Sequence, residues 1–352
     1  MADPTITELL EFAVQHNASD IHLVAGTPPT VRIDAKLKPL DFAPLTAELV
    51  NSLVLSFTGQ GIVDRMNQSR KEQDFSISYG ENRFRCNSYF EGGSMAACLR
   101  LLPRHIPELS TLGAPEIVRE LLSSNQGLFI VAGPTGHGKS TTMASIVSYL
   151  LTQKQVHVIT IEDPIEYILE HKQGIVSQRE VGQDTPSFSS GLRAALREDP
   201  DVVLVGEMRD QETIEATLQL AQTGHLVLST LHTNSAAQTA NRIIDTFPPA
   251  QQQQIRVSLS ETLLGILSQR LLPKIQGGRV LVAELLIANP AVRAVIRDDK
   301  THQLTNMIQT SAAEGMVALD KELARFVTSG IISIDEALSW AQDPKALKMM
   351  IY

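Results

Sequence analysis

The feature that most constrains this chain is the glycine-rich segment GPTGHGKS at residues 133–140. It follows an apolar run, LFIVA, that is typical of a buried strand, and it precedes a stretch with the composition of a helix. The segment fits the pattern G-x-x-x-x-G-K-[ST] in full, and this strand and helix supply the context that the pattern requires. A glycine turn that matched by chance would not be expected to have both neighbours. We therefore predict a phosphate-binding loop.

The residue types in this segment explain how it would hold a nucleotide. Glycines allow successive backbone N–H groups to point inward around an anion, and the amino end of the following helix adds positive potential. Lys139 would reach the outer phosphates of ATP, and the Ser140 hydroxyl would bind Mg²⁺. The residues predicted to bind the nucleotide are Gly133, Pro134, Thr135, Gly136, His137, Gly138, Lys139, Ser140 and Thr141.

One member of the loop, His137, admits two interpretations. Its side chain could turn away from the nucleotide and take no part in binding. Alternatively it could contact phosphate, and the affinity for ATP would then depend on pH near neutrality, because histidine titrates there. The sequence leaves both open.

Acidic residues follow two of the predicted strands. ITIEDPIEY places Glu162, Asp163 and Glu166 close together, which is unfavourable unless a cation or a positioned water uses the carboxylates. DPDVVLVGEMRD ends a second apolar run with a glycine and then Glu207. A carboxylate at the carboxyl end of a sheet strand, beside a phosphate loop, is where a water-orienting group or a metal ligand belongs. We predict that Glu207 orients the attacking water and also binds Mg²⁺.

Two histidines flank a further predicted strand in GHLVLSTLHT. A single histidine is most often structural, but one at a strand end that faces bound phosphate can sense the γ-phosphate. His232 is the better of the two for this role, because it follows the apolar run and so shares a sheet edge with the acids. Neither His225 nor His232 has the neighbours of a metal site.

The pattern of apolar segments changes along the sequence and divides the chain into two parts. Residues 1–102 mix short alternating strands with helices, as in a compact α+β domain. Residues 103–115 contain three prolines and a glycine, which suits a linker. In residues 116–352, apolar strands alternate with helices, so a mostly parallel α/β sheet is expected. From about residue 250 the chain is expected to be largely helical, with one more strand at RVLVAELLI.

Three arginines lie on strands of the predicted N-terminal domain. Arg83 and Arg85 are two residues apart and share one face of their strand, and Arg100 lies on another strand. They could be solvated charges on an exposed face. They could also act as arginine fingers on the ATP of a neighbouring subunit, because guanidinium groups stabilise transition-state charge.

Composition limits the classes of function and the compartment. The 30 basic and 39 acidic residues give a net charge of −9, which argues against nucleic-acid binding as the main activity. Cys86 and Cys98 have no CxxC spacing and are expected to be small buried residues in a reducing compartment. No segment approaches the roughly 20 apolar residues needed to cross a bilayer. We expect a cytoplasmic protein that reaches a membrane only through partners.

Four segments in fixed order resemble the Walker A, Asp box, Walker B and His box of secretion ATPases: GPTGHGKS, ITIEDPIEY, DPDVVLVGEMRD and GHLVLSTLHT. The resemblance covers nearly the whole chain and is strongest to the PilT/PilU branch, the retraction ATPases of type IV pili. SDIHLVAGTPPTVRIDAKLKPL is similar to the N-terminal PAS-like domain of that branch. His137 stands where that family more often has Ser or Thr.

The resemblance implies a RecA-like P-loop ATPase core with a helical C-terminal region, assembled as a homohexameric ring. ATP would lie between the two domains of one subunit and the N-terminal domain of the next. Arginines of that N-terminal domain would act across the subunit boundary. By position in the family motifs, the implied catalytic residues are Lys139, Glu162, Glu166, Glu207, His225, His232, Arg85 and Arg100.

The implied function is to hydrolyse ATP to power type IV pilus retraction, through a platform protein at the cytoplasmic face of the inner membrane. The chain lacks a CxxC…CxxC module and a long N-terminal extension, which favours retraction over pilus assembly or type II secretion. An accessory, PilU-like retraction role stays open, because the ending DPKALKMMIY is similar to that protein. A nucleotide-gated regulatory factor with little turnover and a nucleic-acid translocase are the alternatives from other classes.

Overall fold

The computed structural model describes residues 3–33, 36–58, 72–102 and 105–351. The chain divides into two compact units, Met1–His105 with Pro164–Ile168, and Ile106–Asp163 with Leu169–Tyr352. Of the linker expected at 103–115, residues 103 and 104 lie outside the described residues, and the remainder contains the short 3-10 helix η1 (Leu109–Thr111).

The N-terminal unit is built on an antiparallel sheet of six strands among the described residues, in the order β3-β2-β1-β6-β5-β4. The strands are β1 (Asp20–Leu23), β2 (Thr30–Ile33), β3 (Lys36–Pro39), β4 (Gln73–Tyr79), β5 (Asn82–Glu91) and β6 (Ser94–Leu101). Helix α1 (Ile6–Gln15) begins with a capping box between Thr5 and Glu8, and α2 (Ala47–Thr58) follows β3. Their apolar sides and the inner face of the sheet enclose one core, which includes Phe84 and Leu99.

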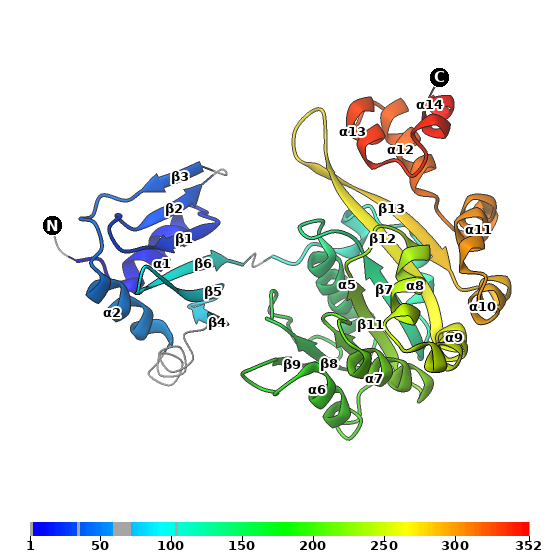
Figure 1. Cartoon of the computed structure of the whole chain (residues 1–352), viewed down its shortest axis with the longest axis horizontal. Helices are drawn as coiled ribbons and strands as arrows, with labels where there is room; N and C mark the ends of the chain where they lie inside the picture. The colour runs from blue at the N-terminus through cyan, green and yellow to red at the C-terminus, as the bar shows by residue number, and fades with distance from the viewer. Residues whose placement is uncertain (1–2, 34–35, 59–71, 103–104, 352) are drawn as a thin grey trace. The chain divides into compact units, whose positions relative to one another are not determined.

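The second unit contains a seven-stranded sheet within the described residues, in the order β13-β12-β7-β11-β10-β8-β9. All neighbouring pairs are parallel except β12 with β13. The strands are β7 (Gly127–Ala132), β8 (His157–Glu162), β9 (Ile175–Glu180), β10 (Val202–Val205), β11 (Leu226–Leu231), β12 (Leu263–Pro273) and β13 (Arg279–Ile287). Figure 1 shows the β12–β13 pair as a long hairpin at one side of this sheet.

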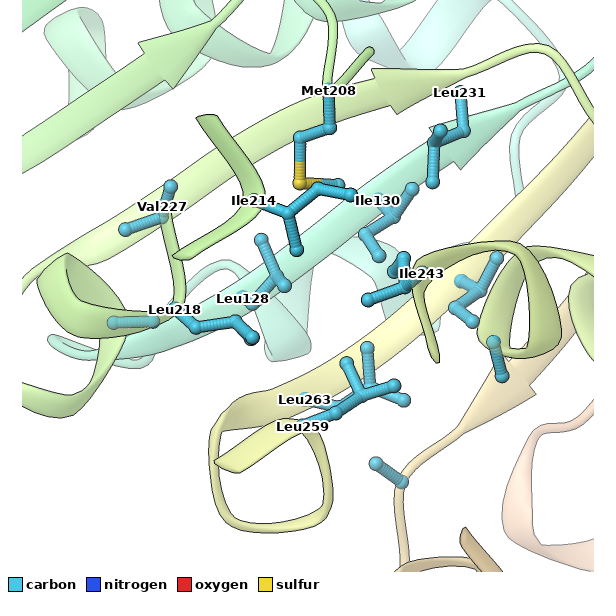
Figure 2. Close-up of a cluster of buried hydrophobic side chains, with 14 of the residues drawn as sticks. Leu128, Ile130, Met208, Ile214, Leu218, Val227, Leu231, Ile243, Leu259 and Leu263 are labelled. Carbon is cyan, nitrogen blue, oxygen red and sulfur yellow. The ribbon is translucent and has the colours of Figure 1, made fainter. Parts of the chain in front are cut away.

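Helices cover both faces of the central strands, which explains why these strands are apolar throughout. Successive residues of β7 point to opposite faces. Leu128 and Ile130 belong to a core shared with α6 (Phe188–Ala195), α7 (Gln211–Gln222), α8 (Ala236–Asp245) and α9 (Pro249–Thr262), part of which Figure 2 shows. Phe129 and Val131 belong to the opposite core, which contains α4 (Ile117–Leu121) and α5 (Lys139–Gln153).

Helices after β13 form two groups. The first contains α10 (Pro290–Arg297) and α11 (Leu304–Thr310), which pack into the α7–α9 core. The second contains α12 (Leu319–Thr328), α13 (Ile334–Trp340) and α14 (Pro344–Ile351), whose apolar side chains surround Leu272 of β12 and Val282 of β13. We call this second group the C-terminal helical group. In the described part of the chain, no helix is long and apolar enough to span a membrane.

The expectation of a single strand after residue 250 was wrong in one respect. The structure has two strands there, because LLGILSQRLLP forms β12 and lies between β7 and β13 in the sheet. Helix α9 ends at Thr262 and β12 begins at Leu263 with no turn residues between them, so the sequence carried no break. Apolar residues in this run also fit helical spacing, and periodicity alone could not separate the two.

Candidate nucleotide-binding site

Parallel strands bring the predicted site residues to one edge of the second unit's sheet. The segment 133–138 follows β7, Glu207 follows β10 and His232 follows β11. These strands are in parallel register, so their carboxyl ends lie side by side. Ligands of open α/β sheets bind outside this edge.

The glycines of the loop are required by its geometry. Gly133, Gly136 and Gly138 have φ values of +151°, +81° and +80°, which side chains rarely tolerate. A Cβ atom at Gly133 would lie 2.5 Å from the carbonyl oxygen of Gln269. Helix α5 begins after Gly138 without a side-chain cap, so its first N–H groups have no side-chain partner at the cap. The loop therefore has the open, amide-lined form that receives phosphate.

Lys139 is largely buried, with 8% of its surface exposed, and its ammonium group lies against the loop. Its Nζ donates hydrogen bonds to the carbonyl oxygens of Gly133 (2.9 Å) and Pro134 (3.0 Å). It also lies 3.2 Å from Nδ1 of His232. The ammonium group is thus held inside the loop by two of the loop's own carbonyl oxygens.

His232 links this lysine to the predicted water-orienting carboxylate. An ammonium group can only donate, so Nδ1 of His232 must accept from Lys139. The ring proton is then on Nε2, which lies 3.6 Å from Oε1 of Glu207. Burial lowers the pKa of His232, and the positive charge of Lys139 lowers it further, so the neutral ring is favoured. The Thr135 hydroxyl also lies 3.3 Å from Nδ1.

Glu207 has a second partner that the sequence did not suggest. Arg209 donates from Nε to Oε2 of Glu207 at 2.7 Å, and this hydrogen bond raises the pKa of Arg209. A further nitrogen of Arg209 lies 3.7 Å from Asp163. Arg209 is two residues after Glu207, and this spacing in EMRD was the signal that could have indicated the pair.

The three acids of the ITIEDPIEY segment have different surroundings in the structure. Glu162 ends β8 and accepts hydrogen bonds from Thr160 (2.6 Å) and Gln178 (3.1 Å). Asp163 faces Arg209 instead. Glu166 lies in the segment Pro164–Ile168, which groups with the N-terminal unit. Within the second unit, Glu162 and Asp163 therefore each have polar partners of their own.

His225, the other histidine of the GHLVLSTLHT segment, lies at the opposite end of β11 from His232. It directly precedes β11, and its carbonyl oxygen accepts from Gly127, the first residue of β7. Its Nδ1 lies 3.0 Å from the carbonyl oxygen of Leu220. The six residues of β11 separate the two histidines, so about 20 Å lies between His225 and His232.

Arg85 and Arg100 lie directly opposite each other on β5 and β6, on one face of the N-terminal sheet. The next partner in the same row is Asp20 of β1, which accepts from Nε of Arg100 at 2.8 Å. This hydrogen bond is the main cause that raises the pKa of Arg100. Arg32 of β2 continues the row. Arg83 lies on the same strand face as Arg85 and donates to Ser76.

The residues predicted to hold Mg²⁺ fit a metal that is bound mainly through the nucleotide. Ser140 is exposed at the start of α5, and Glu207 is held by Arg209. Among the described residues there is no cluster of three or more His, Cys, Asp or Glu side chains that could hold a metal ion by itself. Mg²⁺ needs few protein ligands where phosphate oxygens and water complete its shell.

The side chain of His137 turns away from the phosphate-receiving side of the loop. Its Nδ1 accepts from the backbone N–H of Leu271 at 3.0 Å, and its carbonyl oxygen accepts from Gln269 at 2.7 Å. Burial lowers the pKa of His137, as do the charges of Arg270 and Lys139. Gln269 was not predicted as a site residue, because it lies on the strand that was predicted to be helical.

Comparisons with known proteins agree with this geometry. The chain matches the family described as type II/IV secretion system protein over residues 2–277. It is 44% identical to the type IV pilus retraction ATPase PilT of Pseudomonas aeruginosa, over 97% of this chain and 99% of that one. It is 40% identical to a twitching motility protein of Neisseria gonorrhoeae, over 97% of this chain and 92% of that one.

Similarity also extends to a solved structure. The crystal structure of the pilus retraction motor PilT with bound ADP is 49% identical and has a TM-score of 0.91, covering 98% of this chain and 99% of that one. The resemblance seen in the four motifs is thus confirmed, and so is the α/β fold with a RecA-like core and an N-terminal domain. The chain belongs to the type II/IV secretion system protein family.

Proposed function

We propose that this chain is an ATP-hydrolysing motor subunit that powers retraction of type IV pili. The observation that carries the proposal is the single imidazole of His232, which contacts both Lys139 and Glu207. Lys139, which would bind the phosphates, and Glu207, which would orient the water, are therefore connected through one side chain. Relatives named for pilus retraction and twitching motility support the direction of the motor.

The geometry supports a defined sequence of events in one subunit. ATP binds with its phosphates against the loop amides, and Lys139 exchanges the carbonyl oxygens of Gly133 and Pro134 for phosphate oxygens. Glu207 then orients a water toward the γ-phosphate, and Lys139 stabilises the charge that develops on the phosphate oxygens. Mg²⁺, bound through Ser140, would neutralise phosphate charge. Release of phosphate lets Lys139 return to the loop and to His232.

Arg85 and Arg100 are proposed to complete the site of the neighbouring subunit in a homohexameric ring. They present a pair of guanidinium groups on one face of a sheet, and Asp20 orients Arg100 through a hydrogen bond. Two like charges directly opposite on a sheet are unfavourable, so an anion on this face would relieve them. The triphosphate of another subunit is such an anion.

The partners proposed beyond the ring are the type IV pilus machinery and its inner-membrane platform protein. The motor would work at the cytoplasmic face of that membrane, and its contact with the membrane would pass through the platform. We propose no nucleic-acid substrate, because the net charge is −9.

Deleting the gene in a piliated host tests the direction of the motor. Accumulation of surface pili with loss of twitching is expected for a retraction motor. Loss of pili would instead indicate an assembly motor, and normal pili with weakened retraction force would indicate an accessory role. Complementation with Lys139→Ala, which removes the phosphate-binding charge, should not restore retraction.

A further inference from the structure

His137 of the phosphate loop is hydrogen-bonded to β12 through both its main chain and its side chain. Gln269 donates to the carbonyl oxygen of His137 at 2.7 Å, and Leu271 donates to the imidazole Nδ1 at 3.0 Å. A backbone N–H can only donate, so the ring must present a lone pair at Nδ1. These contacts fix the orientation of the peptide units in the middle of the loop.

The other side of the same ring contacts the C-terminal helical group. The rings of His137 and Trp340 are T-shaped, with 5.0 Å between centroids and 70° between planes. Trp340 ends α13 and donates from Nε1 to Glu336 at 3.0 Å. The turn after it is held by Asp320 of α12, which accepts from the N–H groups of Gln342 and Asp343. Trp340 is therefore fixed to its own group of helices.

Arg270, a buried arginine, connects the contact between His137 and Trp340 to the segment after β11, which contains His232. Arg270 is 3% exposed, and its guanidinium lies 5.5 Å from the centroid of the Trp340 ring. It donates to the carbonyl oxygen of Asn234, two residues after His232. Glu284 of β13 accepts from Ala236 at the start of α8 and from Gln342.

Two buried polar atoms at this junction have no hydrogen-bond partner among the described residues. They are Oε1 of Gln269 and Nε of Arg270. Buried polar groups are almost always paired, and an unpaired one is unfavourable. These two atoms lie on neighbouring residues of β12, directly beside the contacts of His137 and Trp340.

We propose that His137 is a positioning residue that holds the phosphate loop ready for nucleotide, braced against β12 and Trp340, and so couples nucleotide binding to the packing of the C-terminal helical group. The inference rests on nucleotide binding at the loop. A loop held in its binding form binds more tightly, because less ordering is needed on binding. Coupling is reciprocal, so nucleotide must also change the surroundings of Trp340.

The test uses the intrinsic fluorescence of the full-length assembled protein, which has one tryptophan. Titration with ADP or ATP should change the emission of Trp340. His137→Ser should lose this change and bind nucleotide about 5-fold or more weakly by calorimetry. His302→Ser is the matched control, because His302 is exposed on the same unit, and it should keep both properties.

A second pair of variants tests the contact between His137 and Trp340 by substituting Trp340 in the C-terminal helical group. Trp340→Leu removes the ring edge and should weaken nucleotide binding about 5-fold or more, whereas Trp340→Phe keeps an aromatic edge and should stay within about twofold. Parent protein that binds nucleotide with unchanged emission would overturn the coupling and leave the proposed function standing. Trp340→Leu with unchanged or tighter binding would also overturn it. No binding by the parent would overturn both proposals.

Discussion

The contacts between individual side chains at the site determine which nitrogen of the His232 ring carries the proton. His232 accepts from Lys139 through Nδ1 and presents Nε2 toward Glu207, an arrangement that only the neutral ring allows. Arg209 donates a hydrogen bond to the other oxygen of Glu207 and so fixes the orientation of the carboxylate. The contacts of His232 with Lys139 and Glu207 join residues that follow different strands, so a substitution at one of them should affect the orientation of the next.

Glu207→Gln should retain nucleotide binding and lower steady-state turnover by at least about 100-fold, because an amide cannot orient and polarise the attacking water as a carboxylate does. ATPase assays and calorimetry on the same preparation would measure the two effects. Glu215→Gln is the matched control, since Glu215 is exposed on α7. Turnover within about twofold of the parent would remove Glu207 from this role.

Lowering the pH should reduce ATP turnover, because the ring of His232 becomes protonated. Its pKa is below the usual value because of burial and then of Lys139, partly offset by Glu207, while Arg209 lowers it further. The ring is therefore neutral at pH 7, and falling pH places a proton on Nδ1 against the lysine ammonium. In kcat/KM profiles from pH 5.5 to 8, His232→Gln should flatten the acid limb, because glutamine does not titrate. An identical acid limb in this variant would contradict the assignment.

At the scale of elements, the site depends on how closely β12 approaches the loop after β7. These two strands are parallel neighbours, and the Gln269 carbonyl oxygen occupies the space where a side chain at Gly133 would lie. The phosphate loop is therefore shaped by a strand that lies more than a hundred residues away in the sequence.

Gly133→Ala should weaken nucleotide binding by about 10- to 100-fold, because the new Cβ would lie 2.5 Å from that oxygen and the backbone φ is +151°. Calorimetry with ADP would measure the loss. Gly182→Ala is a matched control, since Gly182 also has a positive φ, +86°, but open space around it. Equal affinities in the parent and Gly133→Ala would show that the close approach does not matter for binding.

Local signals explain what the sequence could predict. The phosphate loop and the strands on either side of it were found because their glycines, lysine and apolar runs are close in sequence. Strand β9 was missed because IVSQRE is short and half polar, and β12 was missed because α9 runs directly into it. The contacts of His137 with Leu271 and Trp340 depend on tertiary packing, and no pattern within one segment encodes them.

For the whole molecule, the proposed ring predicts that the N-terminal sheet acts on another subunit. The row Arg85, Arg100, Asp20 and Arg32 runs across four neighbouring strands on one face, which suits recognition of an anion from outside the unit. The same chain would then supply a phosphate loop to one site and arginines to the next.

Arg100→Ala should reduce turnover by about 10³-fold or more in the assembled ring, the effect of losing a guanidinium at a transferring phosphate, and should change little in isolated subunits. ATPase rates on size-separated hexamers and monomers would measure it. Lys38→Ala is the control, because Lys38 is an exposed cation of the same sheet. Equal losses in both forms would argue against action across the boundary.

The position of β7 in its sheet has a consequence for how the chain folds while the ribosome is synthesising it. β7 is made at residues 127–132, but its two neighbours are β11, at residues 226–231, and β12, from residue 263 onward. The nascent strand must wait for about a hundred further residues before it can pair, and during this time its apolar surface is open to chaperones. Chains released before Leu263 should therefore fail to retain ADP on a desalting column, even though every glycine of the loop has been translated.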